Sequence, residues 1–263
     1  MRNSLFGKTL HQRVRDDVDS RHRRSSYSWP AGLAKLAKGI MKLLLTSAGI
    51  RNASIHGALL DLLPKPIAEC NALCIPTAHY GHPKGTPAGA RRFINGQSGC
   101  PMCELGWKSV GVLELTALPS LARERWESWV RQADVLLVDG GDALYLCHWM
   151  RQSGLADLLQ TLPGMVWVGL SAGSMVMTPR VGADFVETKP PITGTDLALG
   201  VVDFSIFPHL DYPTFPENTM ACAEKWAASL ENPSYAIDDE TAIKVVDGNV
   251  EVVSEGHWKY FGR

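Results

Sequence analysis

Short apolar segments alternate with longer amphipathic segments from residue 41 to residue 263. The apolar segments are rich in Val, Leu and Ile, which is typical of buried β-strands, whereas apolar residues three or four positions apart indicate helices that bury one face. The predicted strands cover 42–46, 72–76, 110–115, 135–138, 165–168, 201–207, 235–237, 242–246 and 250–253. The predicted helices cover 52–63, 120–132, 142–160, 172–177 and 217–230.

This order of elements indicates an α/β fold. Strands that alternate with helices favour a mostly parallel sheet with helices on both faces. Asp247-Gly248 lies between the last two predicted strands and predicts a small antiparallel hairpin at one edge of the sheet. No internal repeat or low-complexity segment interrupts the pattern, so residues 41–263 are predicted to form a single α/β domain.

Composition changes this picture at the N-terminus. The chain has a formal net charge of −1, but residues 1–40 hold nine Lys or Arg against three Asp and show no sustained apolar period. We therefore expect a flexible, basic N-terminal extension. Lysines interrupt its longest apolar stretch, which argues against a secretory signal.

The rest of the composition excludes several classes of protein. A near-neutral charge gives no reason to expect nucleic acid or an anionic membrane as a partner. No segment approaches the roughly 20 uncharged apolar residues that a membrane span needs. Six cysteines in a chain of 263 residues do not form a disulfide scaffold, so a reducing, cytoplasmic location is expected.

The pattern G-x-S-x-G at residues 169–173 is the strongest chemical motif of the chain, with Ser171 at its centre. An apolar strand precedes it and a short predicted helix follows it. A sharp turn between the two would push the central side chain out of the sheet, and only small neighbours such as Gly169 and Gly173 leave room for that turn. The sequence therefore predicts a serine nucleophile rather than a serine that is merely small and polar.

A serine nucleophile needs a base, and the base needs an orienting acid. His209 follows the predicted strand 201–207, where a parallel sheet presents catalytic groups, whereas His257 lies beyond the final hairpin and is interpreted as structural. The acid is expected within Asp238-Asp239-Glu240, which follows the strand 235–237. Mutual repulsion predicts that one of the three faces the histidine and the others face solvent.

An oxyanion hole needs two backbone N–H groups directed at the developing charge. Ala172, the residue after the nucleophile, is expected to supply one. The second is expected from a neighbouring strand end, where the paired glycines Gly140 and Gly141 allow close approach of the backbone to a substrate.

Four motifs together resemble those of the peptidase E (aspartyl dipeptidase) and cyanophycinase group of serine peptidases, whose fold is similar to that of class I glutamine amidotransferases. They are Val-Asp-Gly-Gly-Asp at 138–142, Gly-Leu-Ser-Ala-Gly at 169–173, Phe-Pro-His at 207–209 and Ile-Asp-Asp-Glu-Thr-Ala at 237–242. They occur in the order of that family and span essentially residues 41–263.

The resemblance implies a role for each matching residue. Ser171 would be the nucleophile and His209 the general base, with the N–H groups of Gly141 and Ala172 as the oxyanion hole. The acid position falls on Asp239, where peptidase E has glutamate, and Glu240 is the rival.

The resemblance also bears on the substrate, which would be a small peptide. Gly140 and Asp142 are expected to contact it, and Asp142 replaces the asparagine of the family pattern. Because of that substitution, the substrate side chain that the protein prefers stays open. An acidic substrate residue would need a basic partner, for which the candidates are Arg151, Arg180 and Lys189. The chemistry requires no cofactor and no metal, and self-association of the chain stays open.

Three other interpretations compete with this one. An esterase of the α/β-hydrolase type would use an aspartate with His257, because its triad runs in the order Ser, acid, His. A non-catalytic binding protein could retain the fold. A metal site could form from His79-x-x-His82 and Cys100-x-x-Cys103, but the glycine-rich segment between the two pairs gives no reason for them to meet, and ordinary loop residues are the preferred interpretation.

Overall fold

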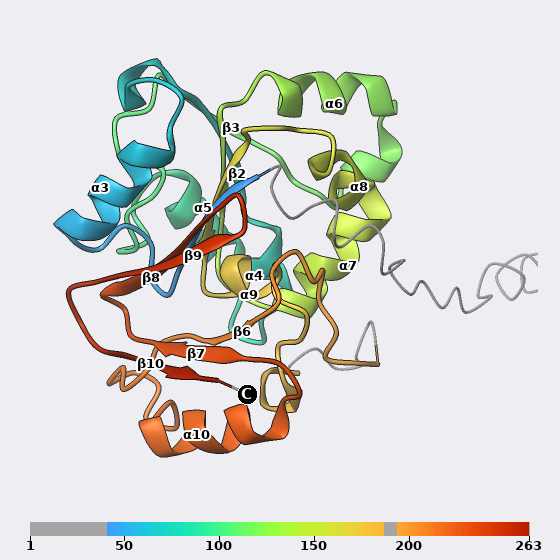
Figure 1. The fold of residues 1–263 in the computed structure, drawn as a ribbon. Helices are drawn as coiled ribbons and strands as arrows, with labels where there is room; N and C mark the ends of the chain where they lie inside the picture. Colours follow the sequence, from blue (N-terminus) through green and yellow to red (C-terminus); the bar gives the residue numbers. More distant parts are fainter. Residues whose placement is uncertain (1–40, 187–193, 263) are drawn as a thin grey trace, which may run out of the picture. The chain divides into compact units, whose positions relative to one another are not determined.

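The computed structural model describes residues 41–186 and 194–262. The predicted N-terminal extension, residues 1–40, lies outside the described residues, as does Lys189. The described helices and strands follow the predicted alternation along the chain (Figure 1).

A seven-stranded sheet forms the centre of the described part of the chain. Its strands lie in the order β3-β2-β4-β5-β1-β8-β9. The first five are parallel to one another, β8 runs antiparallel to β1, and β9 pairs antiparallel with β8 to complete an edge hairpin, which confirms the predicted α/β fold class. The bounds are β1 Lys42–Thr46, β2 Asn71–Ile75, β3 Ser109–Val112, β4 Val135–Val138, β5 Val166–Leu170, β8 Thr241–Val246 and β9 Asn249–Ser254.

Helices cover both faces of this sheet, as Figure 1 shows with α3 and α5 on one side and α6, α7 and α8 on the other. On the first side, Leu44, Leu137 and Val168 from three adjacent strands pack against Leu59 of α3 and Phe93 of α5, all of them buried. The α-helices are α3 Ala53–Leu62, α4 Thr77–Gly81, α5 Pro87–Ile94, α6 Arg123–Arg131, α7 Ala143–Ser153, α8 Leu155–Leu159, α9 Ala172–Met175 and α10 Met220–Ser229. The 3₁₀ segments in the described ranges are η1 Ile67–Glu69, η2 Leu118–Ser120 and η3 Ala183–Phe185, each a single turn.

A second sheet of three strands was not anticipated. It consists of β6 Ser205–Phe207, β7 Ser234–Ile237 and β10 Trp258–Phe261, in the order β10-β7-β6. Phe207 and Ala236 of this sheet pack against Trp226 of α10. The strand at 235–237 therefore belongs to a separate sheet, and the strand predicted at 201–207 is shorter than expected.

The predicted helix at 142–160 is two helices. The backbone of Gly154 adopts φ 82°, in the left-handed region, so the chain turns between α7 and α8. An isolated glycine in an otherwise helical pattern does not reveal this conformation on its own.

The hairpin predicted from Asp247-Gly248 is present between β8 and β9. Both turn residues have positive φ, 51° and 80°, as a two-residue turn that matches the twist of the strands requires. None of the helices in the described ranges is long and apolar enough to cross a membrane.

Two glycines with open space around them provide a test of this backbone analysis. Gly248→Ala is expected to lower the free energy of unfolding by about 1 kcal/mol, because alanine is strained at positive φ. Gly57→Ala, in the middle of α3, is expected to raise it by about 0.5–1 kcal/mol. Thermal unfolding should show shifts of opposite sign, each of roughly 2–4 °C. Equal shifts would contradict the assigned turn.

Candidate active site

Ser171 lies at the sharp turn between β5 and α9. Its backbone has φ 47° and ψ −107°, an unusual conformation for any residue with a side chain. Its N–H donates to the carbonyl of Thr46 at the end of β1, at 3.0 Å. A Cβ at Gly169 would overlap the backbone of Gly173, and one at Gly173 would overlap the carbonyl of Val138, so both neighbours must be glycine. The turn has the geometry of a nucleophile elbow.

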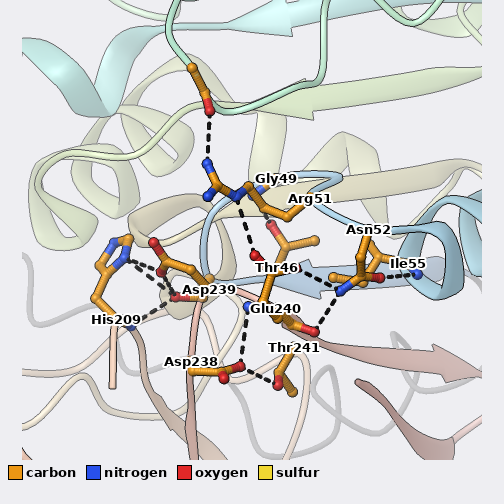
Figure 2. A network of polar contacts seen from close by, with 12 residues as sticks. Thr46, Gly49, Arg51, Asn52, Ile55, His209, Asp238, Asp239, Glu240 and Thr241 are labelled. Atoms are coloured by element: carbon orange, nitrogen blue, oxygen red, sulfur yellow. Dashed lines mark hydrogen bonds and ion pairs between the residues drawn. The ribbon is translucent and has the colours of Figure 1, made fainter. Parts of the chain in front are cut away.

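His209 and Asp239 form a hydrogen-bonded pair, seen in Figure 2. Nδ1 of His209 lies 2.7 Å from Oδ1 of Asp239. A carboxylate only accepts, so Nδ1 carries the proton of this bond and leaves Nε2 as the basic nitrogen. No side chain or backbone group within the described ranges bonds to Nε2. His209 follows β6 and Asp239 lies between β7 and β8, so the small second sheet carries this pair.

The surroundings of Asp239 favour its ionised form. Burial by itself raises the pKa of this carboxyl, but the hydrogen bond and charge of His209, the hydrogen bond from Ser47 and the charge of Arg51 together hold the pKa below its ordinary value. Asp239 is therefore ionised at neutral pH and able to orient an imidazole.

The three adjacent acids have different contacts. Asp238 is buried, and its carboxylate accepts from the hydroxyl of Thr241 and the N–H groups of Glu240 and His257. The expectation that the acids other than the histidine's partner face solvent is wrong for Asp238, because these three donors replace water.

Glu240, the rival acid, has its partners on another segment. Oε2 accepts from Asn52 at 3.1 Å, and Oε1 lies 3.6 Å from Nε of Arg51. Figure 2 shows these side chains around the start of α3, away from the ring of His209. Its observed contacts therefore fasten the turn to the α3 segment.

His257 makes contacts that differ from those of His209. Its Nδ1 lies 2.9 Å from Asp238 and its Nε2 lies 3.0 Å from Asp211, so both ring nitrogens face carboxylates. The side chain is 55% exposed. These contacts agree with the structural interpretation of His257.

The loop after β4 lies beside Ser171. A Cβ on Gly140 would come within 3.5 Å of Cβ of Ser171, and the N–H of Gly140 donates to the side chain of Asp139. Gly141 has φ 139°, and a Cβ there would overlap the carbonyl of Ala78. The N–H of Gly140 is thus occupied, whereas that of Gly141 has no acceptor within the described part of the chain.

The second N–H expected of an oxyanion hole is also available. Ala172 is the first residue of α9, so no carbonyl lies one helical turn before it to accept its N–H. Gly141 and Ala172 therefore present the kind of backbone donors that an oxyanion hole uses.

Asp142 has a structural contact that the motif did not reveal. It is buried, and its Oδ1 caps α7 by accepting from the N–H groups of Leu144 and Tyr145, each at 2.8 Å. An aspartate directly before an apolar helix is a recognisable N-cap signature. Its expected contact with the substrate stays a prediction.

The candidate carboxylate binders have other partners. Arg180 forms an ion pair with Asp196, with N–O distances of 3.0 and 3.2 Å, and Arg151 donates to the carbonyl of Ala198. Arg180 is therefore paired with a carboxylate, whereas the partner of Arg151 is a neutral carbonyl.

Ser47 was missed by the sequence analysis. Its hydroxyl lies 2.9 Å from Oδ1 of Asp239 and accepts the backbone N–H of His209 at 2.7 Å. The signal that was present is a polar residue directly after the apolar strand 42–46, at the edge where functional groups gather.

The His and Cys pairs do not assemble into a metal site. Nδ1 of His79 faces Asp139, and the thiol of Cys103 hydrogen-bonds to that of Cys74 on β2. No cluster of three or more metal-ligating side chains occurs in residues 41–186 and 194–262.

Asp139 is a buried acid next to the candidate oxyanion loop. Its Oδ2 has no hydrogen-bond partner within the described ranges, and Nδ1 of His79 lies 3.6 Å away. Burial raises the pKa of Asp139 to about 8, against a smaller opposing effect of the Gly140 N–H. Burial, with the charges of His82 and Arg92, lowers the pKa of His79. Both groups are therefore neutral near pH 7, and their contact is not an ion pair.

The strained serine after a parallel strand, with a His–Asp pair at the same sheet edge, places the molecule among α/β proteins that carry a nucleophile elbow. Residues 43–253 match the model of peptidase family S51, and the chain belongs to that family. This membership confirms the resemblance to the peptidase E group.

Individual relatives agree with the family assignment. A protein of Listeria monocytogenes, described as the uncharacterized peptidase Lmo0363, is 28% identical over 120 residues. The match covers 43% of this chain and 57% of that relative, so it spans little more than half of the relative's length.

Solved structures show the same fold. A putative peptidase E protein from Listeria monocytogenes superposes with a TM-score of 0.58 at 17% identity, covering 83% of this chain and 99% of that one. A peptidase from an acI-B1 Actinobacterium gives a TM-score of 0.53 at 19% identity, covering 86% and 98%. At these identities the likeness establishes the fold alone.

Replacement of Asp139 tests the buried carboxyl. The folded state retains the proton up to about pH 8, whereas the unfolded chain loses it near pH 4, so wild-type stability falls as pH rises between these values. Asp139→Asn keeps an acceptor for the Gly140 N–H and removes this loss. We expect its melting temperature to exceed that of wild type by roughly 5 °C at pH 8, with a smaller gain near pH 4. The exposed Asp157→Asn on α8 serves as the control, and a gain independent of pH would contradict the raised pKa.

Proposed function

We propose that this protein is a serine peptidase that hydrolyses short peptides. The main support for the proposal is that Ser171 and His209 both form hydrogen bonds to the same dipeptide, Thr46–Ser47, at the end of β1. The backbone of Ser171 bonds to Thr46, and His209 bonds to the adjacent Ser47. The nucleophile and the base therefore flank the same point of the sheet edge. Membership of a peptidase family supports the same conclusion.

In the proposed mechanism, Ser171 Oγ attacks the scissile carbonyl while Nε2 of His209 takes the hydroxyl proton. Asp239 holds Nδ1–H and stabilises the imidazolium that results. The N–H groups of Gly141 and Ala172 bind the oxyanion of the tetrahedral intermediate. His209 then protonates the leaving amine, and an acyl-enzyme ester on Ser171 remains.

A water molecule completes the cycle. His209 removes a proton from the water as it attacks the ester carbonyl, and the same imidazolium returns that proton to Ser171 Oγ as the carboxylic acid leaves. Every proton is transferred through His209, so the chain needs no cofactor for this reaction.

The substrate and setting follow from the same reasoning. We propose small peptides as substrates, with Gly140 and Asp142 beside the reacting carbonyl, and a cytoplasmic location. Arg180 is already paired with Asp196, which gives no support to an acidic-residue preference through it, whereas Arg151 has a neutral carbonyl as its partner and stays a candidate. The preferred side chain is best found by screening a dipeptide library against wild type and Ser171→Ala.

Two other functions are outcomes of the test. An esterase that uses His257 would need that imidazole as base, yet its two ring nitrogens face Asp238 and Asp211. A non-catalytic binding protein would have no use for the strained backbone of Ser171 or for an ionised Asp239.

Three substitutions separate these functions. Ser171→Ala and His209→Ala are each expected to lower kcat/KM for dipeptide hydrolysis by about three orders of magnitude or more. The serine and the histidine take part in the same step, so that loss of either one removes most of the catalysis. His257→Ala should retain most of the activity. A fluorophosphonate probe should label wild type at Ser171, and circular dichroism would check that each variant is folded. Loss of turnover in Ser171→Ala and His257→Ala, with activity retained in His209→Ala, would favour the esterase. Absence of both labelling and turnover in wild type would favour a binding protein.

A further inference from the structure

Ser47 holds together the groups of the candidate active site. It is fully buried at the carboxyl end of β1, the strand between β5 and β8. Its hydroxyl has a 2.7 Å bond from the N–H of His209 and a 2.9 Å bond to Oδ1 of Asp239. The same oxygen of Asp239 accepts Nδ1–H of His209 at 2.7 Å. Three short bonds therefore close a ring of interactions between Ser47, the backbone and imidazole of His209, and the carboxylate.

Hydrogen-bond chemistry fixes the direction of each bond. A hydroxyl has one proton to donate, and a carboxylate only accepts, so Ser47 gives its proton to Asp239. Its lone pairs then receive the N–H of His209. Nδ1 of His209 lies 3.4 Å from Oγ of Ser47, a longer contact that points to Asp239 as the main acceptor of Nδ1–H.

The backbone of His209 explains why this N–H needs a partner. His209 has φ 56°, in the left-handed region that residues with side chains rarely adopt. Such a conformation costs of order 1–3 kcal/mol and persists only when neighbouring groups hold it. A short hydrogen bond to a buried hydroxyl at this residue opposes its relaxation to an ordinary loop conformation.

We propose that Ser47 is a positioning residue of the active site, which sets the orientation of the imidazole of His209 relative to its acid. This inference rests on the proposed peptidase function. Ser47 acts through two groups together: it holds the backbone from which the imidazole projects and the carboxylate that binds the ring. It does not touch the substrate in this role. Of the other charged or titratable groups, Arg51 and Cys100 lie near enough to Asp239 to interact with its charge.

A merely structural buried serine offers the matched control. Ser205 on β6 is equally buried, and its hydroxyl also donates one bond, to the carbonyl of Arg180, and accepts one, from Asn232. Ser47→Ala and Ser205→Ala therefore remove the same atom from the same kind of environment. Only the first breaks contact with His209 and Asp239.

The experiment compares these two variants with wild type and with Ser47→Thr, which restores a hydroxyl. Ser47→Ala is expected to lower kcat by roughly 10- to 100-fold, the effect of losing one hydrogen bond to a charged group, with little change in KM. Its pH profile of kcat/KM should also shift. Ser205→Ala should lose stability but keep kcat and the pH profile, and Ser47→Thr should recover part of the activity.

A second readout does not depend on turnover. The Nδ1 proton of a histidine bonded to a carboxylate gives a separate, far-downfield proton NMR signal, which should be present in wild type and Ser205→Ala. It should broaden or move in Ser47→Ala. If that variant does not fold, Ser47→Cys, with a thiol that bonds weakly at similar volume, replaces it in both measurements.

The outcomes separate the two proposals. If Ser47→Ala matches Ser205→Ala in kcat, pH profile and the Nδ1 proton signal, the positioning role is overturned and Ser47 is only structural. If wild type neither hydrolyses peptides nor reacts with the fluorophosphonate probe, the peptidase function fails, and the NMR comparison alone decides whether Ser47 orients His209.

Discussion

The hydrogen bonds of the dipeptide Thr46–Ser47 are the constraint on which the site depends. Thr46 donates its hydroxyl to the carbonyl of Gly169 and accepts the N–H of Ser171 on its own carbonyl, which fastens the elbow to β1. Ser47, one residue further, bonds to the backbone of His209 and to Asp239. Because successive residues of a strand point in opposite directions, one strand end can hold the segment of Ser171 with one residue and that of His209 with the next. The large sheet and the small sheet meet at this point of the chain.

The same bonds offset the strain at the site. Ser171 and His209 both have positive φ, at a cost of order 1–3 kcal/mol each. A buried hydrogen bond contributes about 0.5–1.5 kcal/mol net, and more when a partner is charged. One bond alone does not offset this cost, so the bond from the N–H of each residue to this dipeptide acts together with the packing of the buried strands. The strain is therefore local, and the surrounding sheet keeps it in place.

The sequence predicted what local patterns determine and missed what long-range contacts determine. The alternation of apolar segments predicted the parallel sheet, and the positive-φ turn at Asp247-Gly248 and the elbow at Ser171 follow from residue types alone. The separate sheet of β6, β7 and β10 was missed. Its paired strands lie about 30 residues apart (β6 and β7) and about 20 residues apart (β7 and β10), and the alternation of apolar and polar residues within a strand does not reveal its partner. Ser47 was missed for a related reason: one serine after a strand is common, and its importance comes from partners 162 and 192 residues away.

The contacts of the acidic turn, residues 238–240, could not be predicted from the sequence either. Asp238, Asp239 and Glu240 are alike in the sequence, and the fold gives each a different set of donors. Asp238 accepts from the Glu240 N–H and the Thr241 hydroxyl, so it shapes the turn, while Glu240 fastens the turn to Asn52. With both neighbours held by other groups, the carboxylate of Asp239 reaches Nδ1 of His209 at 2.7 Å. Asp239, rather than either neighbour, is thus the acid that faces His209, because Asp238 and Glu240 are held by donors of their own.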